Sequence, residues 1–79
     1  MSQETDFCIE TVYVPLLDEG TTVFRPTKAV RLTEGAYRLL ATVDYDAEAE
    51  VWQFPPGSVV ECQWEERDKN RVLVARNIA

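Results

Sequence analysis

SVVECQWEE, residues 58–66, decides the fold, because its apolar and polar residues alternate more regularly than those of any other stretch in the chain. Successive side chains of an extended strand point to opposite faces, so Val60, Cys62 and Trp64 are expected on one face. The intervening glutamates and glutamine then share the opposite face. We therefore expect a strand with one face in a core and the other in water.

The segments on either side of this strand have a similar composition, rich in β-branched and aromatic residues. Turn residues separate them at 17–20, 33–36 and 67–70, where glycine, aspartate or asparagine occurs. Pro15 is expected to close the first strand or to place it at a sheet edge, and Pro26 to mark a bend in one long strand. Strands are expected at 7–17, 21–25 continuing as 27–32, 36–43, 58–66 and 71–77.

The number and length of these segments predict an all-β fold. No stretch has the apolar period of 3.6 that an amphipathic helix requires. Five or six short antiparallel strands in fewer than 80 residues are too few for an ordinary two-sheet sandwich, whereas a small closed barrel removes exposed strand edges. We expect one barrel domain over residues 7–79, preceded by a flexible N-terminus at 1–6.

Two neighbouring segments, residues 36–43 and 44–57, differ in their residue pattern. The strand expected at 36–43 alternates so that Tyr37, Leu39, Ala41 and Val43 share one face. Residues 44–57, DYDAEAEVWQFPPG, break the alternation, and we interpret them as a long loop with at most a short helical turn. Loops of more than about 12 residues are uncommon in compact domains unless they bind something or are disordered.

The lack of histidine and the scarcity of cysteine limit the chemistry open to this chain. Histidine is the commonest general base near neutral pH, so Ser-His and Cys-His activation of a nucleophile is excluded. A structural zinc ion takes four nitrogen or sulfur ligands as a rule, and Cys8 and Cys62 are the only two such residues. We expect both cysteines to be unbridged small hydrophobes. No catalytic residue, metal or cofactor is expected.

The net charge of −6 bears on partners and location. A negative surface repels phosphate backbones, so direct nucleic-acid binding is not expected, whereas a protein partner with a basic surface is favoured. No apolar run approaches the ~20 residues of a membrane-spanning helix. The polar, acidic start differs from a secretory signal, so a cytoplasmic location is expected.

Several strings in this sequence resemble known families. LLDEGTTVFRP, AYRLL, WQFPPGSVVEC and LVA resemble a group of uncharacterised small bacterial proteins, and this resemblance implies a Src-homology-3-like β-barrel. Locally, ATVDYDAEAEVWQFPPGSVVEC is similar to the opening of eukaryotic Src-homology-3 domains. Their paired tryptophans and closing Ser-x-Tyr element are absent, which puts proline-peptide binding in doubt. The resemblance implies a fold and no function.

The acidic part of the long loop is the main candidate site. Asp44, Asp46, Glu48 and Glu50 alternate with small or apolar residues, so an extended segment would place four carboxylates on one side. Such a run is ordinarily a solvated loop that maintains solubility. It is also a suitable docking strip for arginine and lysine on a partner. A calcium loop or a glycosidase carboxylate pair fits less well, because the usual calcium-loop spacing and a substrate cleft are missing.

Aromatic and turn residues complete the candidate site. Trp52 and Phe54 either plug the open end of the barrel or leave one ring exposed as an anchor for a partner, together with Tyr45. Asp18 and Glu19 lie at a turn tip, where a solvated turn is the ordinary interpretation and partner binding the alternative. A last set of aromatics is expected to pack in the core or against a strand face: Tyr13, Phe24, Tyr37 and Trp64.

We interpret the chain as a non-enzymatic protein-interaction module, a small acidic regulator or inhibitor that presents residues 44–54 to a basic partner. The alternative is a nucleic-acid mimic that occupies the channel of a nuclease or defence complex, as acidic phage-encoded anti-CRISPR proteins do. A hydrolase that uses the acidic loop is a third hypothesis, weakened by the missing base and cleft. The sequence does not fix the oligomeric state.

Overall fold

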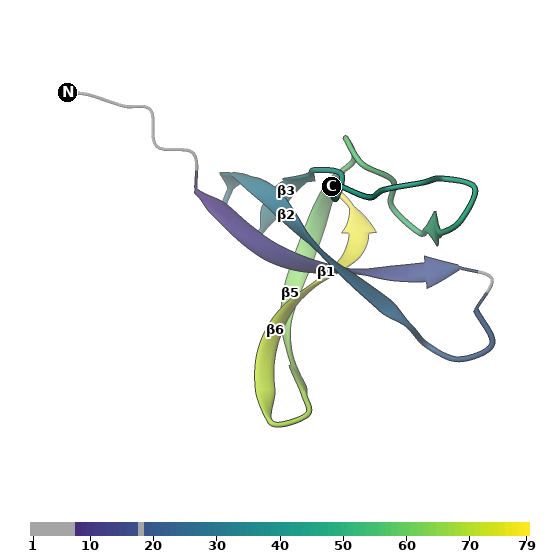
Figure 1. Cartoon of the computed structure of the whole chain (residues 1–79). Coiled ribbons are helices and arrows are strands. Elements are labelled where there is room, and N and C mark those ends of the chain that lie inside the picture. The colour runs from purple at the N-terminus through teal and green to yellow at the C-terminus, as the bar shows by residue number, and fades with distance from the viewer. Residues whose placement is uncertain (1–7, 18) are drawn as a thin grey trace.

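Six β-strands form the regular secondary structure of residues 8–17 and 19–79, the part of the chain that the computed structural model describes (Figure 1). The all-β prediction is confirmed. The expected flexible segment at 1–6 and the expected first strand residue, Phe7, lie outside the described residues. The strands are β1 (Ile9–Leu17), β2 (Phe24–Thr33), β3 (Ala36–Leu39), β4 (Val51–Trp52), β5 (Val59–Arg67) and β6 (Asn70–Ile78).

Five of these strands close into a ring through the order β1, β2, β3, β5, β6 and back to β1. The first four pairings are antiparallel. The closing pairing of β6 with β1 is parallel, with Val12 opposite Leu73 and Tyr13 opposite Val74. Successive strands of an up-and-down ring reverse direction, so an odd number of strands brings the first and last together in parallel. The sequence prediction of antiparallel strands therefore holds for every junction except this one.

The interior of the ring is filled by alternate residues of the strands. Val12 and Val14 of β1, Leu39 of β3 and Val60 of β5 have no exposed surface. Trp52 and Phe54 are 4% and 5% exposed and belong to the same core. The structure thus agrees with the interpretation of these two aromatics as packing residues, and a small core of this kind depends strongly on such large side chains.

Pro15 and Pro26 both lie inside strands, in positions where the missing N–H does not interrupt the β1–β2 pairing. Pro15 lies opposite Phe24 and Pro26 opposite Tyr13. Leu16 N donates to Val23 O, just before β2, at 2.9 Å, so the residue after Pro15 continues the hydrogen bonding of β1. β2 runs unbroken through Pro26, although the expected strand residues 21–23 lie outside it.

The strand predicted at 36–43 is shorter than expected, because β3 ends at Leu39. The prediction that Val43 shares a strand face with Tyr37 and Leu39 is wrong, since Val43 lies beyond β3 and is fully exposed while those two residues are buried. Continued pairing beyond Ala29 and Leu39 would place Pro26 opposite Thr42. Proline has no N–H to donate there, so the ladder ends and the chain turns away after the bond from Leu40 N to Lys28 O.

The prediction that Trp64 packs on the buried face with Val60 and Cys62 is also wrong, because Trp64 is 54% exposed. The β5–β6 register shifts between Glu61 and Cys62 because Arg76 is an extra residue in β6, so the bulge leaves the alternation of β5 unchanged and does not explain the exposure of Trp64. Beyond it the hairpin projects past the ring (Figure 1). We call residues 63–73 the outer hairpin.

Candidate functional site

The acidic connection between β3 and β4 is a folded turn around Asp46. Glu48 N donates to Asp46 Oδ1 at 2.9 Å, and Ala49 N and Glu50 N both donate to Asp46 O at 3.0 Å. An aspartate side chain that bonds the backbone two residues ahead stabilises this kind of turn. The four carboxylates therefore do not form the single extended row that their alternation predicted. The short helical turn that the sequence allowed is the better description.

Glu50 is held against the protein by two donors. Arg25 Nε donates to Glu50 Oε1 at 3.0 Å and Arg25 Nη2 donates to Oε2, while Trp52 Nε1 donates to Oε1 at 3.1 Å. The hydrogen bonds from Arg25 and then from Trp52 lower the pKa of the Glu50 carboxyl, and the same contact raises the pKa of Arg25. Glu50 thus anchors the connection to β2, and its charge is matched within the chain.

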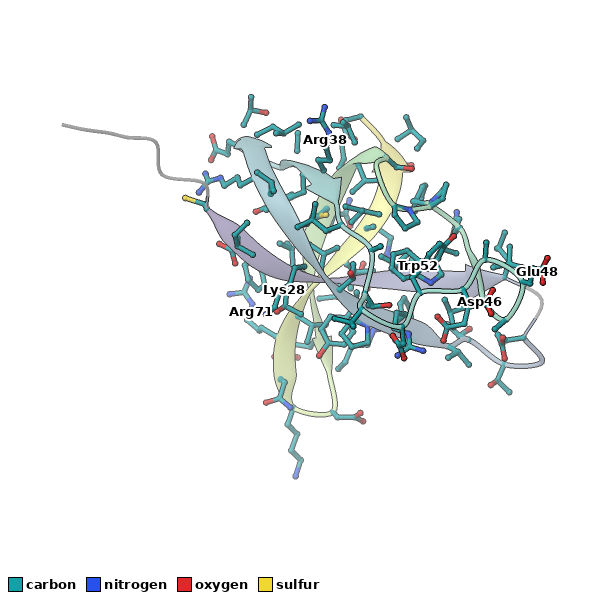
Figure 2. The ribbon with its side chains drawn as sticks, turned by 45° about the horizontal axis from the view of Figure 1, so that its top comes forward. Lys28, Arg38, Asp46, Glu48, Trp52 and Arg71 are labelled. Carbon is teal, nitrogen blue, oxygen red and sulfur yellow. The ribbon has the colours of Figure 1, made fainter. Side chains whose placement is uncertain are left out.

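Aromatic packing fixes the same connection from the other side. The Tyr45 ring meets Trp52 edge to face, with centroids 4.9 Å apart and an interplanar angle of 76°. Tyr45 is half-buried, and Trp52 and Phe54 are buried. These three candidate residues hold the loop in place and offer a partner little surface. Asp44, Asp46 and Glu48 are exposed, and Figure 2 places Asp46 and Glu48 at the far end of the connection.

Apolar and acidic side chains meet at the end of β1. Leu17 pairs with Val51, and both are exposed. Glu19, two residues beyond Leu17, is exposed as well, whereas Asp18 lies outside the described residues. We call Leu17, Glu19, Asp46, Glu48 and Val51 the acidic end. The sequence analysis grouped the acidic residues because they alternate with small or apolar ones. It could not predict that Leu17 and Val51 would be paired, because they are far apart in the sequence.

Burial makes the Cys62 thiol a poor nucleophile. Cys8 and Cys62 are both free, and burial raises the pKa of the Cys62 thiol to about 11. A thiol with such a pKa is almost fully protonated near neutral pH. In the part of the chain that the structure describes, no three histidine, cysteine, aspartate or glutamate side chains gather in a way that would hold a metal ion.

The outer hairpin carries arginine and aromatic contacts that the sequence did not reveal. Arg67 lies 4.2 Å from the centroid of the Phe24 ring, and Arg71 lies 5.5 Å from that of Trp64. Arg76 of β6, beyond the outer hairpin, donates to both oxygens of Glu65 at 2.6 Å. The spacing of these residues along the chain gives no signal, because each contact joins residues of two different strands.

Comparison of the chain with protein-family models, with curated proteins and with solved structures gives no match. No helix long and apolar enough to cross a membrane occurs among residues 8–17 and 19–79.

Proposed function

We propose that this protein is a small non-enzymatic interaction module that binds a basic surface of a partner protein through its acidic end and Asp44. A role as a regulator or inhibitor in the cytoplasm fits a module of this size. We also propose that its fold is a Src-homology-3-like barrel, an assignment supported by the ring of five strands and the short chain.

The observation that carries the proposal is the side-by-side arrangement of exposed apolar and acidic groups on a braced support. Asp46 and Glu48 lie in a turn held by backbone hydrogen bonds, and Glu50 ties that turn to Arg25. Exposed Leu17 and Val51 supply apolar area beside the charges. Protein interfaces combine an apolar centre with a polar rim, and a rigid surface loses little entropy on binding.

A capture experiment with a charge-matched control tests this function. The protein is immobilised, and proteins retained from a bacterial lysate are compared with those retained by the triple variant Asp44→Asn, Asp46→Asn and Glu48→Gln. The control removes three exposed carboxylates elsewhere: Glu34→Gln, Glu61→Gln and Glu66→Gln.

We expect the site variant to retain basic partners at least roughly tenfold less, because each close charge pair contributes strongly once water is excluded. The control variant has the same net charge as the site variant, and it should retain basic partners as well as the unmodified protein does. Equal retention by the two variants would contradict the proposal, because net charge alone would then explain binding. Competition of the retained protein by nucleic acid, abolished at high salt, would instead indicate the mimic mechanism.

A further inference from the structure

A groove of about 500 Å³ lies between the first half of β1 and the outer hairpin, on a surface distinct from the acidic end. One wall is formed by Ile9, Thr11 and Tyr13 of β1, with Lys28 of β2. The other wall contains Trp64 and Arg71, together with Val72 and Leu73. Trp64 is 54% exposed and supplies a large apolar ring to this groove.

Two cations face the groove without a carboxylate partner among the described residues. Lys28 Nζ donates to Thr11 Oγ1 at 2.9 Å, and the Arg71 guanidinium lies over the Trp64 ring. The ion pairs found in the described chain involve Arg25, Arg67 and Arg76 instead. Glu10 is the acidic residue that lines the groove. The groove is therefore locally basic and aromatic in a protein of net charge −6.

The backbone of β1 is open along the same groove. Cys8 O accepts from Arg31 N of β2, and Leu16 N donates to Val23 O just before β2, each at 2.9 Å, so the even-numbered residues of this segment face β2. The odd-numbered residues point the other way, because hydrogen bonding alternates along a strand. In the ladder to β6, Val12 lies opposite Leu73 and Tyr13 opposite Val74, so the Thr11 carbonyl and Tyr13 bond to β6, and Ile9 and the Thr11 N–H remain beside the groove. An open strand edge accepts a further strand.

We propose that this groove binds an extended acidic peptide segment of a partner protein, added as a strand beside residues 9–11. Its carboxylates would lie against Lys28 and Arg71, and an apolar side chain would cover Trp64. Charge complementarity selects an acidic occupant. A single nucleic-acid strand fits less well, because two cations give a small phosphate footprint and a peptide alone supplies both N–H and C=O groups to the strand edge.

Nuclear magnetic resonance titration of the ¹⁵N-labelled protein tests the proposal. The probe is a synthetic octapeptide in which glutamate alternates with valine and threonine. We expect shifts in the amides of Ile9 and Thr11 and in the indole N–H of Trp64. Arg71→Glu and Trp64→Ala should each weaken binding by roughly tenfold or more, as for residues at the centre of an interface. Arg38→Glu, an exposed charge reversal on β3, should bind as the unmodified protein does.

The spectrum of each variant shows whether it is folded, and Lys28→Gln provides a second charge variant, expected to weaken binding, if Arg71→Glu unfolds. Three results would overturn the proposal: equal binding of a peptide with lysine in place of glutamate, tighter binding of a thymidine oligonucleotide of eight residues, or no shifts at about 1 mM peptide. Shifts confined to the acidic end would overturn it too. The function proposed for the acidic end does not depend on any of these outcomes.

Discussion

At the scale of single residues, two carboxylates determine how the structure responds to acid. Glu50 accepts hydrogen bonds from Arg25 and Glu65 accepts them from Arg76, and these bonds lower the pKa of each carboxyl. Their folded pKa values lie below those of the unfolded chain. The stabilisation they provide is therefore complete above the unfolded pKa near 4.5 and is lost as the pH falls through the folded pKa.

We expect Glu65→Gln to lower the free energy of unfolding by about 1 kcal/mol at pH 7, as for a bidentate, partly exposed ion pair. The difference from the unmodified protein should shrink as the pH is lowered from 7 to about 3, because Glu65 becomes protonated in the folded state as the pH falls through its lowered pKa. Urea unfolding at the two pH values measures this. Glu66→Gln, at the neighbouring exposed position, is the control. An undiminished difference at low pH would show that the carboxylate charge of Glu65 is not the cause.

The burial of a residue was predicted correctly where the alternation of its own segment determines it. Burial and partners were not predicted where they depend on a strand that is distant in the sequence. The interpretation of Trp52 and Phe54 as packing residues agrees with their burial. The alternation of β5 also placed Trp64 on a buried face, but Trp64 is exposed, and the outer hairpin that carries it projects past the ring (Figure 1). Arg25 lies 25 residues from Glu50, so their ion pair could not be inferred from spacing.

At the scale of the elements, the turn between β5 and β6 contains strain that a substitution can relieve. Asp68 and Lys69 have φ angles of 50° and 70°, the left-handed values that a tight two-residue hairpin turn requires. A lysine in this conformation costs about 1–2 kcal/mol, and a glycine does not. Glycine also increases the entropy of the unfolded chain, which offsets part of the gain.

We expect Lys69→Gly to raise the free energy of unfolding by about 0.5–1 kcal/mol. Gly35→Ala is the opposing change, because Gly35 has a φ of 85° in the β2–β3 turn, and it should destabilise the protein by about 1 kcal/mol or more. The urea midpoint of each variant measures the change in its free energy of unfolding, provided that the dependence of that free energy on urea concentration is unchanged. A neutral or destabilising Lys69→Gly would mean that the outer hairpin tolerates its turn without strain.

The elements themselves were largely predictable, and their ends were not. Turn residues at 33–36 and 67–70 located two hairpins correctly. The end of β3 at Leu39 depends on Pro26 in the neighbouring strand, which interrupts the ladder where Thr42 would pair. That Pro26 would lie opposite Thr42 can be known only once the pairing of β2 with β3 and its register are known.

At the scale of the whole molecule, β6 closes the ring by pairing with β5 on one side and with β1 on the other. It pairs with β5 along most of its length and with β1 at Leu73 and Val74. Leu73, Val74 and Ala75 are all buried. The sequence predicted a closed barrel from the number of strands, and the ring confirms a barrel-like closure. The parallel contact follows from the odd number of strands in that ring, which the sequence left between five and six.

Two truncations separate closure of the ring from simple shortening of β6. A chain ending at Arg76 loses the pairing at Asn77 and Ile78 and the bond from Ala79 N to Val59 O, but keeps the contact with β1. It should fold with lower stability. A chain ending at Arg71 also loses three buried residues, and burying one Leu or Val side chain contributes about 1.5–3 kcal/mol. That loss is comparable with the total stability of about 5–15 kcal/mol, so this chain should not fold.

Near-ultraviolet circular dichroism and the cooperativity of urea unfolding distinguish the folded truncation from the unfolded one. A cooperative transition in the chain ending at Arg71 would show that β1, β2, β3 and β5 hold the core without closure, because four strands would then bury Trp52 as well as five do.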